Sequence, residues 1–186
     1  MLLHFIFLVT KEDLESRTEE FEYVQQMALF YKKWLKDTFS VDVDVQADQM
    51  VVPEQSLVRR LDTAVLVEDH KSRGSDVFHF YLSNFRPMWT DCTCEGYYAE
   101  NFAMVLWVKP KDDVLSMCQK NCTVVSHELC HEILRQKKIK KQYDMIHDVW
   151  NKHLFKGSDF AKYGKNFEPN DSQPYFMTLD ATDLRS

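Results

Sequence analysis

The sequence predicts an α+β domain in which helices pack on a mixed sheet in two layers. Apolar runs of strand length, separated by turn-forming residues, recur through the first 110 residues. Residues 13–39 break this pattern with the three- and four-residue spacing of a long helix. Residues 112–154 contain no glycine or proline and are rich in helix-forming residues, which indicates further helices after the sheet.

The first third of the chain predicts strand, long helix, strand. Residues 2–9, LLHFIFLV, are an apolar run of strand length. The helix predicted at 13–39 has one apolar stripe, and residues 41–45 then alternate valine with aspartate, as a half-buried strand does. The stripe consists of Phe21, Val24, Met27, Ala28, Tyr31, Trp34 and Leu35.

The middle of the chain predicts more of the sheet. Residues 61–69 and 76–85 indicate two further strands, or a short helix followed by a strand, with turn-forming residues between them. Residues 95–110 predict one strand with its core at 102–108. Residues 112–154 then predict a helical hairpin or two successive helices, and the last thirty residues are mostly irregular.

Length and composition limit the function classes. The 186 residues fit a single domain, with a sheet-rich part at 1–110, helices at 111–156 and an irregular part at 157–186. The net charge of −6 argues against a protein whose main role is to bind nucleic acid. The first apolar run is too short to cross a bilayer and lacks the basic start and cleavage site of a signal peptide. We therefore expect a cytoplasmic or otherwise intracellular protein with no membrane partner.

The five cysteines are an odd number, which fits reduced intracellular thiols better than a disulfide scaffold. Cys130 lies inside a histidine motif and is expected to be a small buried apolar side chain. The other four form two close pairs. These four cysteines could form two disulfides or bind a second zinc ion, although their spacing matches common structural zinc sites poorly. They are Cys92, Cys94, Cys118 and Cys122.

Residues 124–136, VVSHELCHEILRQ, contain His-Glu-x-x-His on a predicted helix. Because positions four apart lie on one helix face, His127 and His131 can offer ring nitrogens to a single zinc ion. Glu128, one position past the first histidine, can approach water at the metal rather than the metal itself. Two surface histidines that fall four apart by chance are the other interpretation, but the motif is a known signature of zinc-binding helices.

This arrangement suits hydrolysis of a peptide bond. Zinc lowers the pKa of coordinated water to about 7, and a nearby carboxylate can take the proton and deliver it to the leaving amine. Zn²⁺ is therefore the predicted cofactor, with His127 and His131 as metal ligands and Glu128 as the catalytic base and acid.

The segment HELCHEIL resembles the zincin metallopeptidases, the HExxH zinc proteases, and so does the predicted order of elements before it. The resemblance implies a zincin-like fold, with a mixed, twisted sheet packed on a long helix and a zinc-binding helix. It also implies a peptide or protein substrate, held in extended form along an edge strand beside the cleft. The candidate for that strand is NFAMVLW at residues 101–107.

A catalytic zinc needs a third protein ligand. The glycine and histidine that metzincins carry shortly after this motif are absent from EILRQKK. A turn within residues 135–142 would let a second amphipathic helix bring His147 back to the metal, an arrangement similar to that of Spartan-like zincins. Asp159, in a segment with a faint likeness to aspzincins, and His153 are the alternatives.

The sequence therefore favours a zinc-dependent metallopeptidase, and the alternative is a zincin-like protein that binds zinc or a partner without turnover. The lysine run at residues 137–141 could contact nucleic acid, as the Spartan-like resemblance would allow. Such a run is more often a solvated turn, and the acidic net charge agrees with that interpretation. The oligomeric state is not indicated by the residues.

Overall fold

The computed structural model describes residues 2–39, 42–53, 63–74, 77–84, 96–99, 101–107, 124–129, 131, 132, 135 and 136. Within them, one five-stranded sheet has the order β2-β1-β3-β5-β4. The strands β2, β1, β3 and β5 run parallel to one another, whereas β4 pairs antiparallel with β5 at one edge. The sheet is therefore mixed, as predicted. The strands are β1 (Leu2–Val9), β2 (Asp44–Val51), β3 (Val77–Ser83), β4 (Gly96–Ala99) and β5 (Phe102–Leu106).

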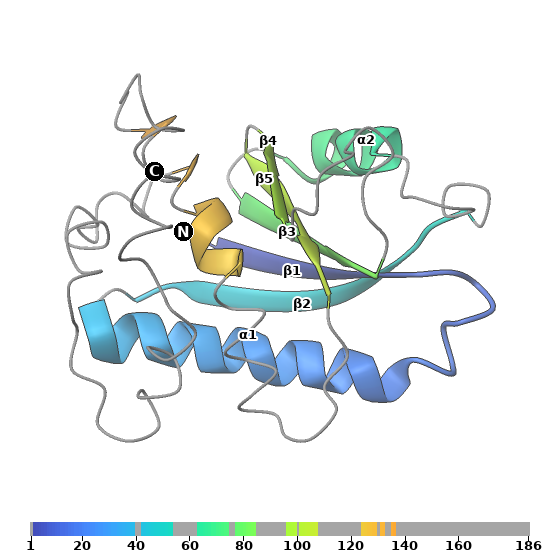
Figure 1. Ribbon diagram of the computed structural model, residues 1–186, viewed down its shortest axis with the longest axis horizontal. Coiled ribbons are helices and arrows are strands. Elements are labelled where there is room, and N and C mark those ends of the chain that lie inside the picture. The colour runs from blue at the N-terminus through green and yellow to red at the C-terminus, as the bar shows by residue number, and fades with distance from the viewer. Residues whose placement is uncertain are drawn as a thin grey trace.

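Two helices, α1 (Thr18–Phe39) and α2 (Ala64–Arg73), cover opposite faces of this sheet (Figure 1). Alternate residues of β1 show why both faces need cover. Phe5 and Phe7 belong to the apolar cluster that includes α1, whereas Ile6 belongs to a second cluster with Leu66 of α2. A parallel strand that is apolar at consecutive positions is stable only when buried on both sides. The two-layer prediction is therefore wrong, because α2 adds a third layer.

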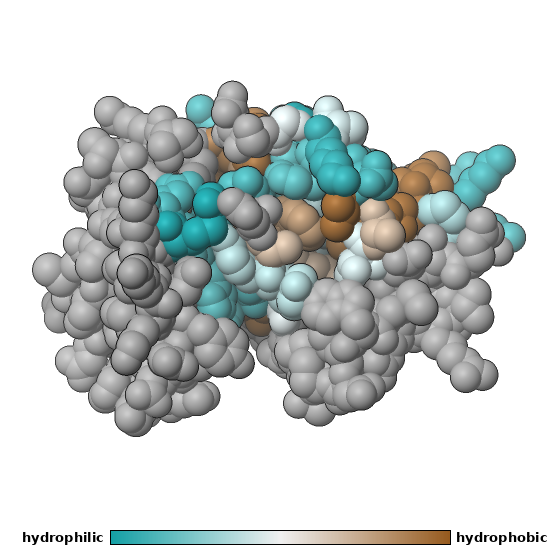
Figure 2. All heavy atoms as spheres, turned by 90° about the horizontal axis from the view of Figure 1, so that it is seen from above, coloured by the Kyte–Doolittle hydropathy of each residue, from teal (hydrophilic) through white to brown (hydrophobic). Residues whose placement is uncertain are grey.

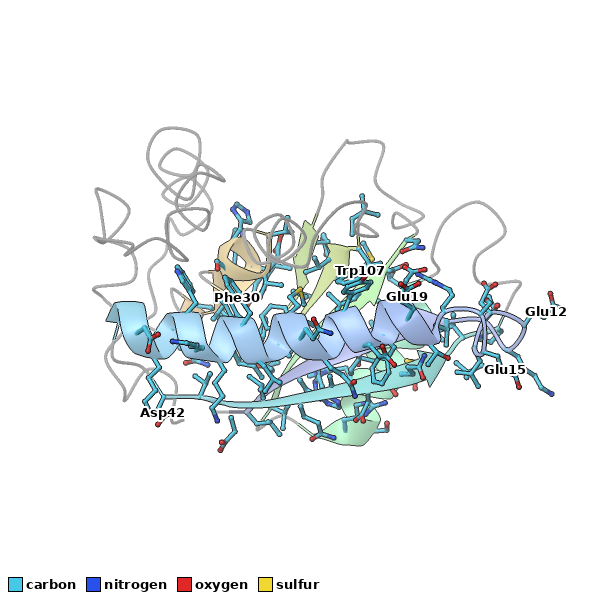
Figure 3. All side chains as sticks on the ribbon, turned by 90° about the horizontal axis from the view of Figure 1, so that it is seen from below. Glu12, Glu15, Glu19, Phe30, Asp42 and Trp107 are labelled. Carbon is cyan, nitrogen blue, oxygen red and sulfur yellow. The ribbon has the colours of Figure 1, made fainter. Side chains whose placement is uncertain are left out.

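The long helix α1 follows its predicted stripe closely. Six of the seven stripe residues are buried, and Phe21 is partly buried against the same cluster. The rings of Tyr31 and Trp34 stack at 5.7 Å, one turn apart on the buried face. The helix begins at Thr18 rather than near residue 13, because residues 11–17 form turns. Figure 3 shows Glu12 and Glu15 near this end of α1 and Asp42 near the other.

Hydrogen bonds to one buried carboxylate, that of Glu20, connect the N-terminal end of α1 to the residue that follows β5. Arg17 donates two hydrogen bonds of 3.0 Å to the carboxylate of Glu20. The indole Nε1 of Trp107 donates a third to the same carboxylate at 2.9 Å. Because this acid is almost fully buried, the three donors offset the cost of removing it from water.

The middle of the chain resolves one prediction and corrects another. Residues 64–73 form α2 and residues 77–83 form β3, so the helix-then-strand alternative is confirmed. The single strand predicted at 95–110 is wrong, because β4 and β5 form a hairpin there. Asn101 lies in its turn with φ 69°, a left-handed conformation that asparagine tolerates better than most residues.

The surface of the described residues is ordinary for a folded domain. Hydrophobic and hydrophilic side chains lie beside one another near the middle of the face seen from above (Figure 2). The large apolar side chains that are exposed, Leu29, Val51 and Val67, lie on three different elements. No helix in the described part of the chain is long and apolar enough to cross a membrane.

Candidate metal centre

The His-Glu-x-x-His motif lies on a helix that packs on the α1 side of the sheet. Residues 124–129, 131, 132, 135 and 136 are helical, and we call them the motif helix. Val125 and Leu129 are fully buried in the cluster that also contains α1. The hydroxyl of Ser126 donates a hydrogen bond of 3.0 Å to the hydroxyl of Tyr31 on α1. This shared cluster places the motif helix on the same face of the sheet as α1.

The three motif side chains lie close enough to act on one ion. The ring centroids of His127 and His131 are 5.0 Å apart, as expected for neighbours on successive helical turns. One potential ligand atom from each histidine and one carboxylate oxygen of Glu128 all lie within 4.8 Å of one another. Among the residues that the structure describes, His127, Glu128 and His131 are the one group of three or more His, Cys, Asp or Glu side chains placed so that they could hold a metal ion.

The carboxyl group of Glu128 is buried against the first residue of β4. Its side chain is only 3% exposed, and burial raises its pKa to about 8. A Cβ atom placed on Gly96 would lie 2.2 Å from Oε1 of Glu128 and 2.7 Å from Cγ1 of Val124. Only glycine leaves room for the carboxylate in this position, which explains why β4 begins with one.

A second acid, Glu132, connects the motif helix to the β4–β5 hairpin. It is almost fully buried and accepts a hydrogen bond of 2.6 Å from the hydroxyl of Tyr98. Arg135 donates to both carboxylate oxygens, at 3.0 and 2.6 Å, and Gln136 donates at 2.9 Å. Burial by itself raises the pKa of Glu132, but these hydrogen bonds outweigh it and hold the pKa below its usual value. Glu132 is therefore a carboxylate.

The hairpin side of this connection involves the turn residue Asn101. Its backbone N–H points at Oε2 of Glu132 at 3.4 Å, and its Oδ1 accepts a hydrogen bond of 2.9 Å from Arg135. The left-handed turn and the helix thus share one polar network. The motif gave no signal for Glu132, since an acid after the second histidine is ordinary on a helix surface.

The edge strand beside the motif helix differs from the predicted one. The segment at 101–107 was the candidate edge, but β5 pairs with β3 on one side and with β4 on the other. Among the described residues, β4 is the edge strand at this end of the sheet, because it pairs with β5 alone. The prediction is wrong because the hairpin adds four residues, Gly96–Ala99, outside β5.

The structure brings together His127, Glu128 and His131 on the motif helix. The neighbouring elements that contact this helix are α1 and β4. The three candidates for a third ligand, His147, Asp159 and His153, lie outside the described residues. The two pairs of cysteines that are close in sequence, at 92 and 94 and at 118 and 122, also lie outside the described residues, as does the lysine run at 137–141. The roles of all these residues stay predictions.

Comparison with known proteins finds distant likeness among solved structures. No family model matches the chain, and no curated protein matches it. Among solved structures, it is similar to the archaemetzincin of Methanopyrus kandleri, with 12% sequence identity and a TM-score of 0.49. The similarity covers 72% of this chain and 73% of that one.

Proposed function

We propose that this protein is a zinc-dependent metallopeptidase in which His127 and His131 hold the metal and Glu128 transfers protons. One observation carries the proposal. Two imidazole nitrogens and a carboxylate oxygen lie within 4.8 Å of one another on one helix, and the carboxylate is buried. A buried acid in such a place is costly to keep, which favours a functional over a structural role.

The donor set fits zinc. Imidazole nitrogen is a preferred ligand of Zn²⁺, and catalytic zinc sites use three protein ligands and keep one position open. The third ligand that we propose is His147, with Asp159 and His153 as alternatives. When bound, zinc supplies Lewis acidity, which makes water more acidic and polarises a carbonyl group.

Glu128 would move the proton that hydrolysis requires. A carboxylate is a good general base when its pKa lies near the working pH, and burial shifts the pKa of Glu128 in that direction. The attacking water gives its proton to the carboxylate, which then gives it to the nitrogen of the leaving amine. The C–N bond breaks as that nitrogen becomes a neutral amine, and the other product is a carboxylic acid.

A peptide substrate has a place to bind beside this site. Within the described part of the chain, the edge strand β4 pairs with β5 alone, and it begins at Gly96, in contact with Glu128. An extended peptide can add to such an edge through main-chain hydrogen bonds. We propose that β4 holds the substrate with its scissile bond near Glu128. A zincin-like fold, inferred from the motif and the mixed sheet, agrees with this placement.

The proposal is tested by measuring cleavage of an unfolded protein substrate with zinc-loaded wild type and with Glu128→Gln. We expect the variant to keep one zinc per chain and to lose about 10²- to 10⁴-fold in cleavage rate. Glu68→Gln is the matched control, because Glu68 is an exposed helix residue on the other side of the sheet. Cleavage that persists in Glu128→Gln would contradict the mechanism, and zinc binding without any cleavage by wild type would favour the non-catalytic alternative.

A further inference from the structure

Tyr98 on β4 contacts two consecutive residues of the motif helix. Its ring lies nearly parallel to the imidazole of His131, with 16° between the planes and 5.3 Å between the centroids. Its hydroxyl donates the 2.6 Å hydrogen bond to Oε2 of Glu132. One side chain of the sheet edge therefore touches both a candidate metal ligand and the acid that follows it.

The acceptor of this hydrogen bond is held in place. The Glu132 carboxylate is buried and also bonded to Arg135 and Gln136 from its own helix. The ring of Tyr98 is limited from the sheet as well, since the ring of Phe78 on β3 lies nearly parallel to it, at 6.4 Å and 17°. The orientation of the Tyr98 ring is thus restricted by the hydrogen bond of its hydroxyl to Glu132 and by the neighbouring ring of Phe78.

We propose that Tyr98 is a positioning residue for His131, which sets the plane of that imidazole and hence the direction of its metal-binding nitrogen. This inference rests on the proposed metal site. An imidazole binds a metal along the lone pair in its ring plane, so rotation about the Cβ–Cγ bond turns the lone pair away. A parallel ring at contact distance restricts that rotation. Residues that orient a ligand in this way are as much part of a metal site as the ligand itself.

Packing alone makes a different prediction. If Tyr98 only fills space, its removal lowers the stability of the protein and leaves the metal site unchanged. If it positions His131, its removal also weakens metal binding and changes the geometry at the metal. Metal affinity and the absorption spectrum of bound Co²⁺ separate the two roles, because neither follows from the stability of the fold.

The test uses Co²⁺ as the probe, titrated into the metal-free full chain. We expect Tyr98→Leu to lower the affinity about 10-fold, within the range for residues that orient metal ligands, and to alter the visible absorption of bound Co²⁺. Tyr98→Phe keeps the ring but loses the hydrogen bond to Glu132. We expect it to recover most of the affinity, with a deficit of about 3-fold.

Two tyrosines provide matched controls. Tyr97→Leu changes the neighbouring residue of β4, which packs in the cluster on the α2 face of the sheet. Tyr81→Phe removes an equivalent hydrogen bond, the 2.7 Å bond from Tyr81 to the carboxylate of Asp69 on α2. We expect both to cost stability without changing Co²⁺ affinity or absorption.

Each failure has its own signature. If wild type binds no Co²⁺ or Zn²⁺, the proposed metal site is wrong and the positioning role falls with it. If wild type binds Co²⁺ and folded Tyr98→Leu binds it with the same affinity and absorption, only the positioning role is wrong. Should Tyr98→Leu fail to fold, equal Co²⁺ affinity and absorption of Tyr98→Phe and wild type would overturn the proposal.

Discussion

Gly96 and Glu128 are in direct contact, and the missing side chain of the first makes room for the carboxylate of the second. An added Cβ would lie 2.2 Å from Oε1 and 2.9 Å from Cδ of Glu128, far inside normal contact distance. The edge strand and the proposed catalytic base therefore depend on each other. A substrate added along β4 would start its path at this contact.

Gly96→Ala should displace the carboxylate of Glu128 and lower the cleavage rate. We expect a loss of about 10²-fold, because small displacements of a catalytic group are costly. Zinc content should stay at one per chain, since the three atoms nearest the new methyl group belong to Glu128 and Val124 and not to the histidines. The measurement is the cleavage rate of zinc-loaded protein, together with metal analysis.

Gly74→Ala is the control for adding a methyl group to a glycine. Among the described residues, no atom beyond those of its chain neighbours and its helix backbone lies within 4 Å of the Cβ position there, but φ is 95°, which strains any other residue. We expect a stability loss of about 1 kcal/mol and an unchanged cleavage rate. A Gly96→Ala protein that cleaves as fast as wild type would show that Glu128 does not act from its buried position.

Glu132→Ala should destabilise the protein by about 3 kcal/mol, because the Tyr98 hydroxyl and the partly exposed Arg135 guanidinium lose their buried acceptor. The measurement is urea unfolding of metal-free protein. Exposed Glu68→Ala is the control, and we expect a change within about 0.5 kcal/mol. Equal unfolding midpoints for Glu132→Ala and wild type would mean that the network does not hold the hairpin to the motif helix.

Stability should fall in mild acid because of buried histidines on the α2 face. Nδ1 of His70 and Nδ1 of His79 lie 2.9 Å apart and share a hydrogen bond, which requires one ring to accept. The ring centroid of His4 is 5.4 Å from that of His79, and His4 is hydrogen bonded to Asp48 at 2.7 Å. Burial, with the charges of His4, His70 and Arg73, lowers the pKa of His79 to about 4, although Asp69 opposes this.

The direction follows from proton binding. An unfolded histidine takes up its proton near pH 6.5, whereas folded His79 resists it until about pH 4, so acid favours the unfolded state between these values. Its contribution to stability is complete above pH 6.5 and is lost as the pH falls towards 4. We expect urea midpoints of wild type to fall more steeply across this window than those of His79→Gln. Parallel pH profiles would contradict the assignment.

Local pattern was enough to predict several elements. The stripe of α1 repeats at helical spacing and meets one apolar cluster, so its burial follows from the sequence. The motif residues His127, Glu128 and His131 are neighbours within one helix, and their closeness depends on helix geometry alone. The apolar run of β1 likewise indicated a buried strand, although not that α2 covers its second face.

Tertiary contacts decided what the pattern missed. Splitting residues 95–110 into two strands depends on the left-handed turn at Asn101, which Arg135 and Glu132 contact from a distant helix. Glu132 itself gains its role only when Tyr98 and the hairpin meet it. Separations of more than thirty residues carry no periodic signal, so neither the edge strand β4 nor this network could be predicted from spacing.

The central claim is that the two motif histidines bind one metal ion. Its most direct measurement is the zinc content of the purified full chain, with zinc-edge X-ray absorption of wild type and His127→Ala. The account predicts one zinc per chain in wild type, with imidazole scattering and a metal–nitrogen distance of about 2.0 Å, and loss of the metal in the variant. A wild-type chain that neither holds nor gains zinc, or a His127→Ala protein with the same spectrum as wild type, would contradict it.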